Sequence, residues 1–181
     1  QYQIDAVEFY DLTPIVKKSW ILQFCQELIS QEVGIRWQIS GGTRCEGIDE
    51  EVIITAKEAG CHYLGFAPES GDPAVLLRIK KRLNLKHLVR LVRMARKHNL
   101  DTRCNLIIGF PEDTRWQIFR TLLFHMRLGT LGVVDSPIFD FTPYPGSELF
   151  KKLRVGGVIG ELNDQYFETL GNNIQWKNRH R

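Results

Sequence analysis

The hydrophobic positions of the chain alternate between two spacings. Short runs of β-branched and aromatic residues, typical of buried strands, are separated by stretches in which apolar residues recur every three or four positions, typical of helices with one buried face. The predicted strands are residues 4–10, 35–40, 61–67, 102–108 and 133–141. Their starts lie roughly 25 to 40 residues apart, a spacing that predicts repeated βα units around a parallel sheet.

Helix boundary signals lie between the predicted strands. Thr13 followed by Pro14 predicts an N-cap and the first residue of a helix that ends at Gly34. Asp49 and Thr114 are expected to cap two further helices, because their side-chain oxygens can accept from unpaired backbone N–H groups of the first turn. The helix after the second of these caps carries a run of apolar residues at helical spacing: Ile118, Phe119, Leu122, Leu123 and Met126.

The remaining helices are expected near residues 74–79 and after Asn84. Residues 78–97 form the most basic segment, but Leu and Val recur within it at helical spacing, which predicts a solvated basic face over an apolar one. With a net charge of only +3, the chain offers no strong electrostatic case for binding nucleic acid. Pro137 indicates that the fifth strand is an edge strand or contains a bulge.

The order of the elements predicts an α/β fold. Parallel strands joined by right-handed crossovers form either a barrel or a doubly wound sheet. A complete eight-unit barrel takes about 250 residues, whereas this chain of 181 residues holds about five units, so we expect a partial (β/α) barrel of the TIM type. Residues 1–153 would form the barrel part, and residues 154–181 a C-terminal extension. The chain opens at Gln1 directly into a strand-like run, which indicates a piece of a longer protein.

Polar and turn-forming residues follow each predicted strand. They are Asp11, "SGGTR" (40–44), "ESG" (69–71), "GFPEDT" (109–114) and "TPYPGSE" (142–148). Any one of these loops is explained by turn and cap chemistry. In a parallel architecture, however, all of them lie at one face, where barrels and open α/β sheets place their sites. Their charges of both signs predict a site for a polar, zwitterionic ligand.

Glycines at the same strand ends support this prediction. Gly41, Gly42, Gly71 and Gly109 lack a Cβ, so a ligand could lie directly against the backbone. The chain contains neither G-x-G-x-x-G nor a P-loop pattern, which argues against a dinucleotide or a nucleoside triphosphate.

The four cysteines, Cys25, Cys45, Cys61 and Cys104, are widely separated and show no metal-ligand spacing. Three of them fall in predicted helices or strands and are expected to be small buried hydrophobes. Nothing suggests a disulfide scaffold, so we expect a reducing compartment and a cytoplasmic protein. No apolar run reaches the ~18 residues of a membrane span.

Five segments taken together carry a family resemblance: "FYDLT", "WQISGGTR", "AKEAGCHYLGFAPESGDPAVLLRIKKRLN", "NLIIGFPEDT" and "FTPYPGSELF". From about Ile4 to Leu153, the chain resembles the radical S-adenosylmethionine superfamily. It is most similar to the branch that often carries a cobalamin-binding domain and that includes the anaerobic magnesium-protoporphyrin monomethyl ester cyclases.

The resemblance implies about five βα units of a (β/α)₆ barrel that holds S-adenosylmethionine and an iron–sulfur cluster, with cobalamin as a further cofactor in this branch. Reductive cleavage of S-adenosylmethionine would yield a deoxyadenosyl radical. Hydrogen abstraction or cobalamin-linked methyl transfer on a small-molecule substrate would follow, with electrons from a donor. The family's C-x₃-C-x₂-C loop is absent, which implies that the first strand and the cluster ligands lie upstream, outside this chain.

The resemblance also implies a set of cofactor-binding residues: Asp11, Arg44, Glu69, Ser70, Lys81, Ile108 and Gly109. Glu69 and Ser70 would lie by the ribose and the methionyl part of the cofactor. Lys81, or else Lys80, would pair with the methionyl carboxylate.

The other members of this set have weaker assignments. Ile108 and Gly109 would line the adenine, and Asp11 is a candidate for the methionyl ammonium group. Arg44 would contact either the substrate or the cofactor.

Three other readings stay open. The chain could be a non-catalytic barrel that binds S-adenosylmethionine or a partner protein. It could belong to a tRNA methylthiotransferase-like enzyme, which would carry an additional basic RNA-binding domain. An aldolase-like barrel would need a catalytic lysine inside a strand, and the predicted strands contain none.

Overall fold

The structure, a computed structural model, describes residues 4–11, 13–160, 162–164 and 166–167. Five strands form one sheet in chain order, and every neighbouring pair is parallel. The strands are β1 (Ala6–Phe9), β2 (Arg36–Thr43), β3 (Cys61–Glu69), β4 (Asp101–Ile108) and β5 (Ile138–Asp140). The helices are α1 (Lys18–Ser30), α2 (Glu50–Glu58), α3 (Pro73–Arg78), α4 (Leu85–Lys97), α5 (Arg115–Thr130) and α6 (Glu148–Val155).

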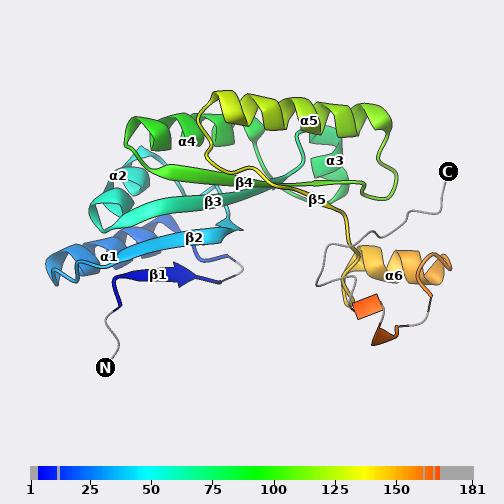
Figure 1. The fold of residues 1–181 in the computed structure, drawn as a ribbon, viewed down its shortest axis with the longest axis horizontal. Helices are drawn as coiled ribbons and strands as arrows, with labels where there is room; N and C mark the ends of the chain where they lie inside the picture. Colours follow the sequence, from blue (N-terminus) through cyan, green and yellow to red (C-terminus); the bar gives the residue numbers. More distant parts are fainter. Residues whose placement is uncertain (1–3, 12, 161, 165, 168–181) are drawn as a thin grey trace.

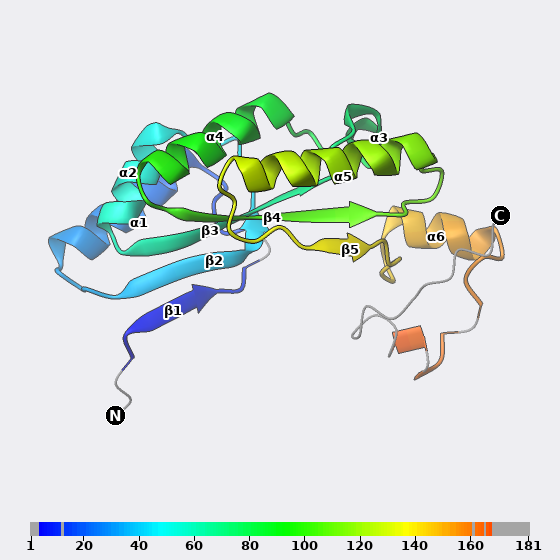
Figure 2. The same cartoon turned by 45° about the horizontal axis from the view of Figure 1, so that its top comes forward.

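The sheet curls into a half-barrel whose convex side carries the connecting helices. Figures 1 and 2 show α2, α4 and α5 along this side of the strands, with the opposite face of the sheet left open. The predicted partial (β/α) barrel is therefore confirmed. An all-parallel sheet with strands in chain order places every helical crossover on the same side.

Two predicted helix caps are confirmed, and each depends only on residues within the first turn of its helix. Asp49 accepts a hydrogen bond from Val52 N–H, and Thr114 forms a capping box with Gln117. The prediction for the first helix is wrong, because α1 begins four residues after Pro14 and its N-cap residue, Lys17, makes no side-chain cap.

A tertiary contact explains the late start of this helix. The Ile15 side chain is fully buried, and its N–H donates to Thr43 Oγ1 over 3.2 Å, so the segment around Pro14 is held as a loop against the end of β2. Nor does the helix run to Gly34: it ends at Ser30, with Gln31 as its C-cap.

Two strands extend further than the sequence predicts. β2 continues through Gly41 and Gly42 to Thr43, and β3 continues to Glu69. Both ends are irregular, with register shifts between Ile39 and Thr43 and between Phe66 and Glu69. The polar motifs after these strands are thus partly built into distorted strand ends.

The fifth strand is shorter than predicted and follows Pro137 directly. It pairs only with β4 among the described strands, so the predicted edge position is confirmed. One isolated bridge, between Arg103 and Asp135, precedes it.

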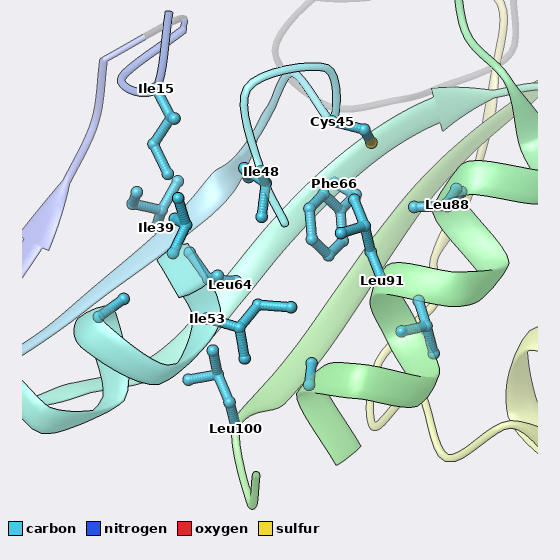
Figure 3. Close-up of a cluster of buried hydrophobic side chains, with 14 of the residues drawn as sticks. Ile15, Ile39, Cys45, Ile48, Ile53, Leu64, Phe66, Leu88, Leu91 and Leu100 are labelled. Atoms are coloured by element: carbon cyan, nitrogen blue, oxygen red, sulfur yellow. The ribbon is translucent and has the colours of Figure 1, made fainter. Parts of the chain in front are cut away.

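The main core lies between the sheet and the helices (Figure 3). Ile39, Leu64 and Phe66 point from β2 and β3 toward Ile53 of α2 and Leu91 of α4. All five side chains are at most 2% exposed. Successive strand residues point to opposite faces, so every second residue enters this core.

Helix α5 buries a different set of residues from the apolar run seen in the sequence. Thr121, Phe124 and Leu128 are its buried residues, whereas Phe119 and Leu123 are exposed. This helix therefore carries apolar residues on both its inner and its outer face.

A second apolar cluster holds α6 in place. Val75, Phe110 and Phe141 form its buried centre, and Leu149 and Leu153 pack against it. The predicted boundary between residues 153 and 154 falls inside this helix, and residues 168–181 of the predicted extension lie outside the described residues. Across the described part of the chain, every helix is too short or too polar to cross a bilayer.

Candidate functional site at the carboxyl ends of the strands

The strand ends bring four of the predicted residues to one edge of the sheet. Asp11 follows β1, Arg44 follows β2, Glu69 ends β3 and Gly109 follows β4. Because these strands are mutually parallel, their carboxyl ends share a single rim. The predicted convergence of these residues on one edge is confirmed.

An ion pair occupies the centre of this rim. Lys81 Nζ lies 3.0 Å from Glu69 Oε1, and both side chains are partly buried. Glu69 has a φ of +64°, which is unusual for a residue other than glycine and is found where surrounding structure enforces it. The Lys81 backbone is fixed too, since its N–H donates to Leu76 O over 2.9 Å.

This ion pair leaves hydrogen-bonding capacity unused. An ammonium group has three donors, and Glu69 accepts one of those of Lys81. The remaining donors can bind an anionic ligand group, and the second carboxylate oxygen of Glu69 can accept from a hydroxyl.

Arg44 and Lys81 line the same pocket, which has a volume of about 240 Å³. Typical small-molecule sites measure ~300–1,000 Å³, so this pocket can enclose only part of such a ligand. Arg44 is exposed, and its Nε lies 3.7 Å from Glu46 Oε2, too far for a strong contact. Its guanidinium group is therefore available to a ligand.

A second pocket of about 400 Å³ adjoins the first, and Lys80 lines both of them. Ile107 of β4 and Asp140 of β5 line this larger pocket, together with Phe110. The two pockets together follow the rim from the end of β2 to the end of β5.

Ser70 has a structural role in the turn after β3. Its side chain is 1% exposed, and its hydroxyl lies 3.0 Å from Thr121 Oγ1 of α5 and accepts from Asp72 N–H over 3.1 Å. A Cβ on Gly71 would lie 2.4 Å from Phe124 Cβ, so this glycine permits α5 to pack closely. A contact between Ser70 and a cofactor stays a prediction.

Of the four glycines marked in the sequence, Gly109 leaves the most open backbone. It has a φ of +79°, and a Cβ there would have no atom within 4 Å. A Cβ on Gly42 would lie 2.9 Å from the Ala67 Cβ, which fills that space. Ile108 is half-buried beside Gly109, whereas Asp11 is exposed.

The open face of the sheet carries polar residues that the sequence reasoning missed. Ser40 Oγ donates to Glu8 between β2 and β1. Asn105 Nδ2 reaches across β3 to Gly41 O over 3.3 Å. Gly65 of β3, which pairs with Arg103 of β4, has no side chain to block this contact.

These polar side chains of the open face form a row, which we call the polar row, and it continues toward the fifth strand. Arg103 donates from Nε to Asn105 Oδ1 over 2.7 Å and pairs through Nη1 with Asp135 Oδ2 at 3.2 Å. Tyr63 OH donates to the same Asp135 oxygen over 3.4 Å. Burial, with the Asp135 carboxylate as a second cause, raises the pKa of Tyr63. These side chains form a hydrogen-bonding surface that could orient a substrate.

A sequence signal for this row does exist. In β4, Arg103 and Asn105 alternate with the buried Cys104 and Leu106, which is the period-two pattern of a strand with one polar face. The sequence prediction considered residues after the strands and overlooked residues within them.

The cysteines do not fit a metal cluster. Burial raises the pKa of the Cys25, Cys45 and Cys61 thiols to about 12 and raises the pKa of Cys104 as well, so all four stay protonated near neutral pH. Metal ligation requires the thiolate. Among the described residues, no three Cys, His, Asp or Glu side chains are grouped as metal ligands.

Comparison with protein families yields a match to the radical SAM superfamily over residues 6–125. The chain is 29% identical over 171 residues to an uncharacterized methyltransferase of Pyrococcus horikoshii, a match that covers 94% of this chain and 36% of the relative. It is 38% identical over 148 residues to the cytidylyl-2-hydroxyethylphosphonate methyltransferase of Streptomyces wedmorensis, a match that covers 80% of this chain and 28% of the relative. It is 23% identical over 156 residues to the anaerobic magnesium-protoporphyrin IX monomethyl ester cyclase of Rubrivivax gelatinosus, a match that covers 84% of this chain and 27% of the relative.

Solved structures of the same fold agree with this family match. Coproporphyrinogen III oxidase of Escherichia coli, a radical SAM enzyme, aligns with a TM-score of 0.64 at 18% identity over 94% of this chain and 39% of that one. The cobalamin-dependent S-adenosylmethionine radical enzyme OxsB aligns with a TM-score of 0.60 at 17% identity over 92% and 24%. The chain spans about a third of the length of the curated relatives it matches.

Proposed function

Because the family model matches more than half of the chain, the chain belongs to the radical SAM superfamily, and we propose that it forms the S-adenosylmethionine-binding part of the catalytic barrel of such an enzyme. The observation that carries this proposal is the Glu69–Lys81 pair at the centre of a rim with adjoining pockets. When bound, S-adenosylmethionine would supply the radical chemistry of the superfamily.

In this proposal, each rim residue has a defined task. Lys81 binds the methionyl carboxylate with the donors that Glu69 leaves unused, and Glu69 accepts from a ribose hydroxyl. Ile108 and the open backbone of Gly109 receive the adenine. Asp11 binds the methionyl ammonium group.

Arg44 contributes positive charge to the same pocket. The polar row on the open face, with Arg103 and Asn105 at its centre, binds and orients a small-molecule substrate. The cluster ligands and the electron donor belong to parts of the enzyme other than this chain, because its cysteines are buried and protonated.

The reaction that we propose is hydrogen abstraction from the substrate or cobalamin-linked methyl transfer to it. The two methyltransferase relatives support the second reaction. Four free, buried thiols are compatible with a reducing cytoplasm, where we place the protein.

Calorimetric titration of the chain with S-adenosylmethionine tests the cofactor site. We expect Lys81→Met to weaken binding about 10- to 100-fold, the effect of losing one charge-assisted hydrogen bond. Lys86→Met, an exposed lysine of α4, is the matched control and should bind like the wild type. Equal affinity of Lys81→Met and wild type would overturn the assignment of Lys81.

A second assay tests the chemistry in the whole enzyme. After anaerobic reconstitution with iron and sulfide, the wild-type enzyme should release 5′-deoxyadenosine from S-adenosylmethionine under reducing conditions, and Lys81→Met should release far less. Binding without any such release would instead support the non-catalytic barrel.

A further inference from the structure

The outer face of α5 is apolar. Trp116, Phe119, Leu123 and Met126 recur at helical spacing, and each side chain is 46–66% exposed. We call these four residues the α5 ridge. The rings of Trp116 and Phe119 lie 5.4 Å apart, and the ridge extends about 15 Å along the helix. Isolated exposed apolar residues are ordinary, but a contiguous row of four on one helix face indicates a contact surface.

The charge around the ridge has one sign. Neither α4 nor α5 contains an aspartate or a glutamate. Together they carry eight cations: Lys86, Arg90, Arg93, Arg96, Lys97, Arg115, Arg120 and Arg127. Only Lys97, with Glu50, and Arg120, with Asp72, form ion pairs within the part of the chain that the structure describes.

Several of these cations lie in the valley between the two helices. Arg96 of α4 reaches Gly132, just beyond α5, where a Cβ would lie 2.7 Å from its Cδ. Arg93 is one turn earlier on the same face of α4. The opposite side of α4 faces α2, since His98 contacts Glu50 there.

The two flanks of the ridge differ. On the flank toward α3 and α4, Arg120 reaches Asp72, and Arg127 lies two turns later on the same face. On the other flank, His125 contacts Ser136 in the segment before β5, Leu122 is exposed, and Arg115 lies two turns before Leu122 on the same face. Most of the positive charge therefore borders the ridge on the side toward α4, and Arg115 is the one cation of α5 on the other side.

We propose that the α5 ridge and the adjoining valley bind an acidic amphipathic helix of a partner protein. The apolar side of that helix packs on the ridge, and its carboxylates lie over Arg93, Arg96 and Arg127. In this helix-in-groove contact, the positive charge of the α4–α5 face favours an acidic helix as the bound partner.

The same charges argue against the other occupants. A second copy of the chain would bring the arginines of one α4–α5 face against those of another. A flat anionic bilayer favours cations along both flanks of an apolar stripe, whereas most of the cations of α4 and α5 border this ridge on one flank and Arg115 alone lies on the other. Single-stranded nucleic acid stacks on successive aromatic rings, and the ridge provides two of them, Trp116 and Phe119, at one end only.

Titration of the 181-residue chain with three synthetic peptides tests the proposal. The probe is a helical peptide of about 18 residues with leucine at three- and four-residue spacing and glutamate elsewhere. One comparison peptide replaces glutamate with lysine, and the other keeps the acidic composition but scrambles the leucine spacing. We expect the acidic amphipathic peptide to bind at least about tenfold more tightly than either and to lose affinity as salt rises.

Backbone amide shifts and matched variants locate the contact. Shifts should concentrate on α4 and α5. Leu123→Ser should weaken peptide binding about tenfold, whereas Leu77→Ser, at a still more exposed leucine of α3, should not. Arg93→Glu should also weaken peptide binding about tenfold, whereas Arg154→Glu on α6 should not.

Four results would overturn the proposal: equal binding of the lysine peptide, no binding of the acidic one, sedimentation of the chain with phosphatidylserine vesicles that Leu123→Ser abolishes, or a dimer that Leu123→Ser dissociates. None of these measurements involves S-adenosylmethionine, so they are independent of the proposed function.

Discussion

The two faces of the sheet differ in composition although the same strands build both. Toward the helices, β3 and β4 present Leu64, Phe66 and Leu106, all fully buried. Toward the open side they present Tyr63, Arg103 and other polar groups joined by hydrogen bonds. The backbone is common to both faces, so only the alternation of side chains separates them.

The two faces therefore have different roles: the helix-covered face stabilises the fold, and the open face presents polar groups. Apolar burial stabilises the folded state in proportion to the area removed from water, and the main cluster of buried apolar residues lies between the sheet and the helices. The open face contributes partly exposed polar contacts, which stabilise little but hold donors and acceptors in fixed positions. The half-barrel can therefore change its open face with little effect on its core.

Truncating the core face should give the largest effect. Phe66→Ala removes a side chain that is 0% exposed and packed between the sheet, α2 and α4, so it should lower the free energy of unfolding by about 3–5 kcal/mol. Urea denaturation followed by circular dichroism measures this loss. A loss below about 1 kcal/mol would mean that the core closes over the cavity or that this face does not control stability.

The buried thiols predict a loss of stability at alkaline pH. The folded-state pKa of Cys25 is raised to about 12, above the unfolded value near 8.5, so the folded protein holds a proton that the unfolded chain releases. The stabilisation is complete below about pH 8.5 and declines at up to ~1.4 kcal/mol per pH unit as the pH rises toward 12. At pH 10 the loss from this residue should be about 2 kcal/mol.

Urea denaturation of wild type and Cys25→Ala at pH 7.5 and pH 10 tests this pH dependence. Lysine and tyrosine ionisation affects both proteins, so the difference between them isolates the thiol. The variant should lose less stability between the two pH values than the wild type. An identical loss in both would show that Cys25 ionises in the folded state as readily as in the unfolded one.

Buried hydrogen bonds join α5 to the turn after β3, and removing them should lower stability by an intermediate amount. Thr121→Val leaves the hydroxyl of Ser70 and the N–H of Gly71 without their Thr121 partner, so it should cost about 1–2 kcal/mol. Thr130→Val, at the exposed end of the same helix, is the control and should change stability by less than about 0.5 kcal/mol. Thermal or urea unfolding of both variants decides the comparison.

The parts of the fold that depend on local chemistry were predictable from the sequence. Asp49 and Thr114 cap their helices because the partner N–H groups are three residues away. Parallel strands in series followed from apolar periodicity. The start of α1 was not predictable, because it depends on the bond between Ile15 and Thr43, which are 28 residues apart.

The site was predictable only where it coincides with strand ends. The motif containing Glu69 marked the rim, but the burial of Ser70 depends on Thr121, which the sequence places 51 residues away. The outer apolar face of α5 was hidden too, since periodicity alone does not say which of two apolar stripes packs on the sheet. The polar row was visible in the alternation of β4, although polar strand residues also occur on ordinary solvated faces.

The smallest effect should come from the open face. Arg103→Gln removes the contact of Arg103 with Asp135, whose side chain is 45% exposed, so solvent screening should limit the cost to about 0.2–1 kcal/mol. A double-mutant cycle with Asp135→Asn measures the coupling between the two side chains directly. If the row orients a substrate, turnover by the whole enzyme should fall far more than the free energy of unfolding. A stability loss as large as that of Phe66→Ala would mean that this polar row holds the fold together and that the two faces are not separated in function.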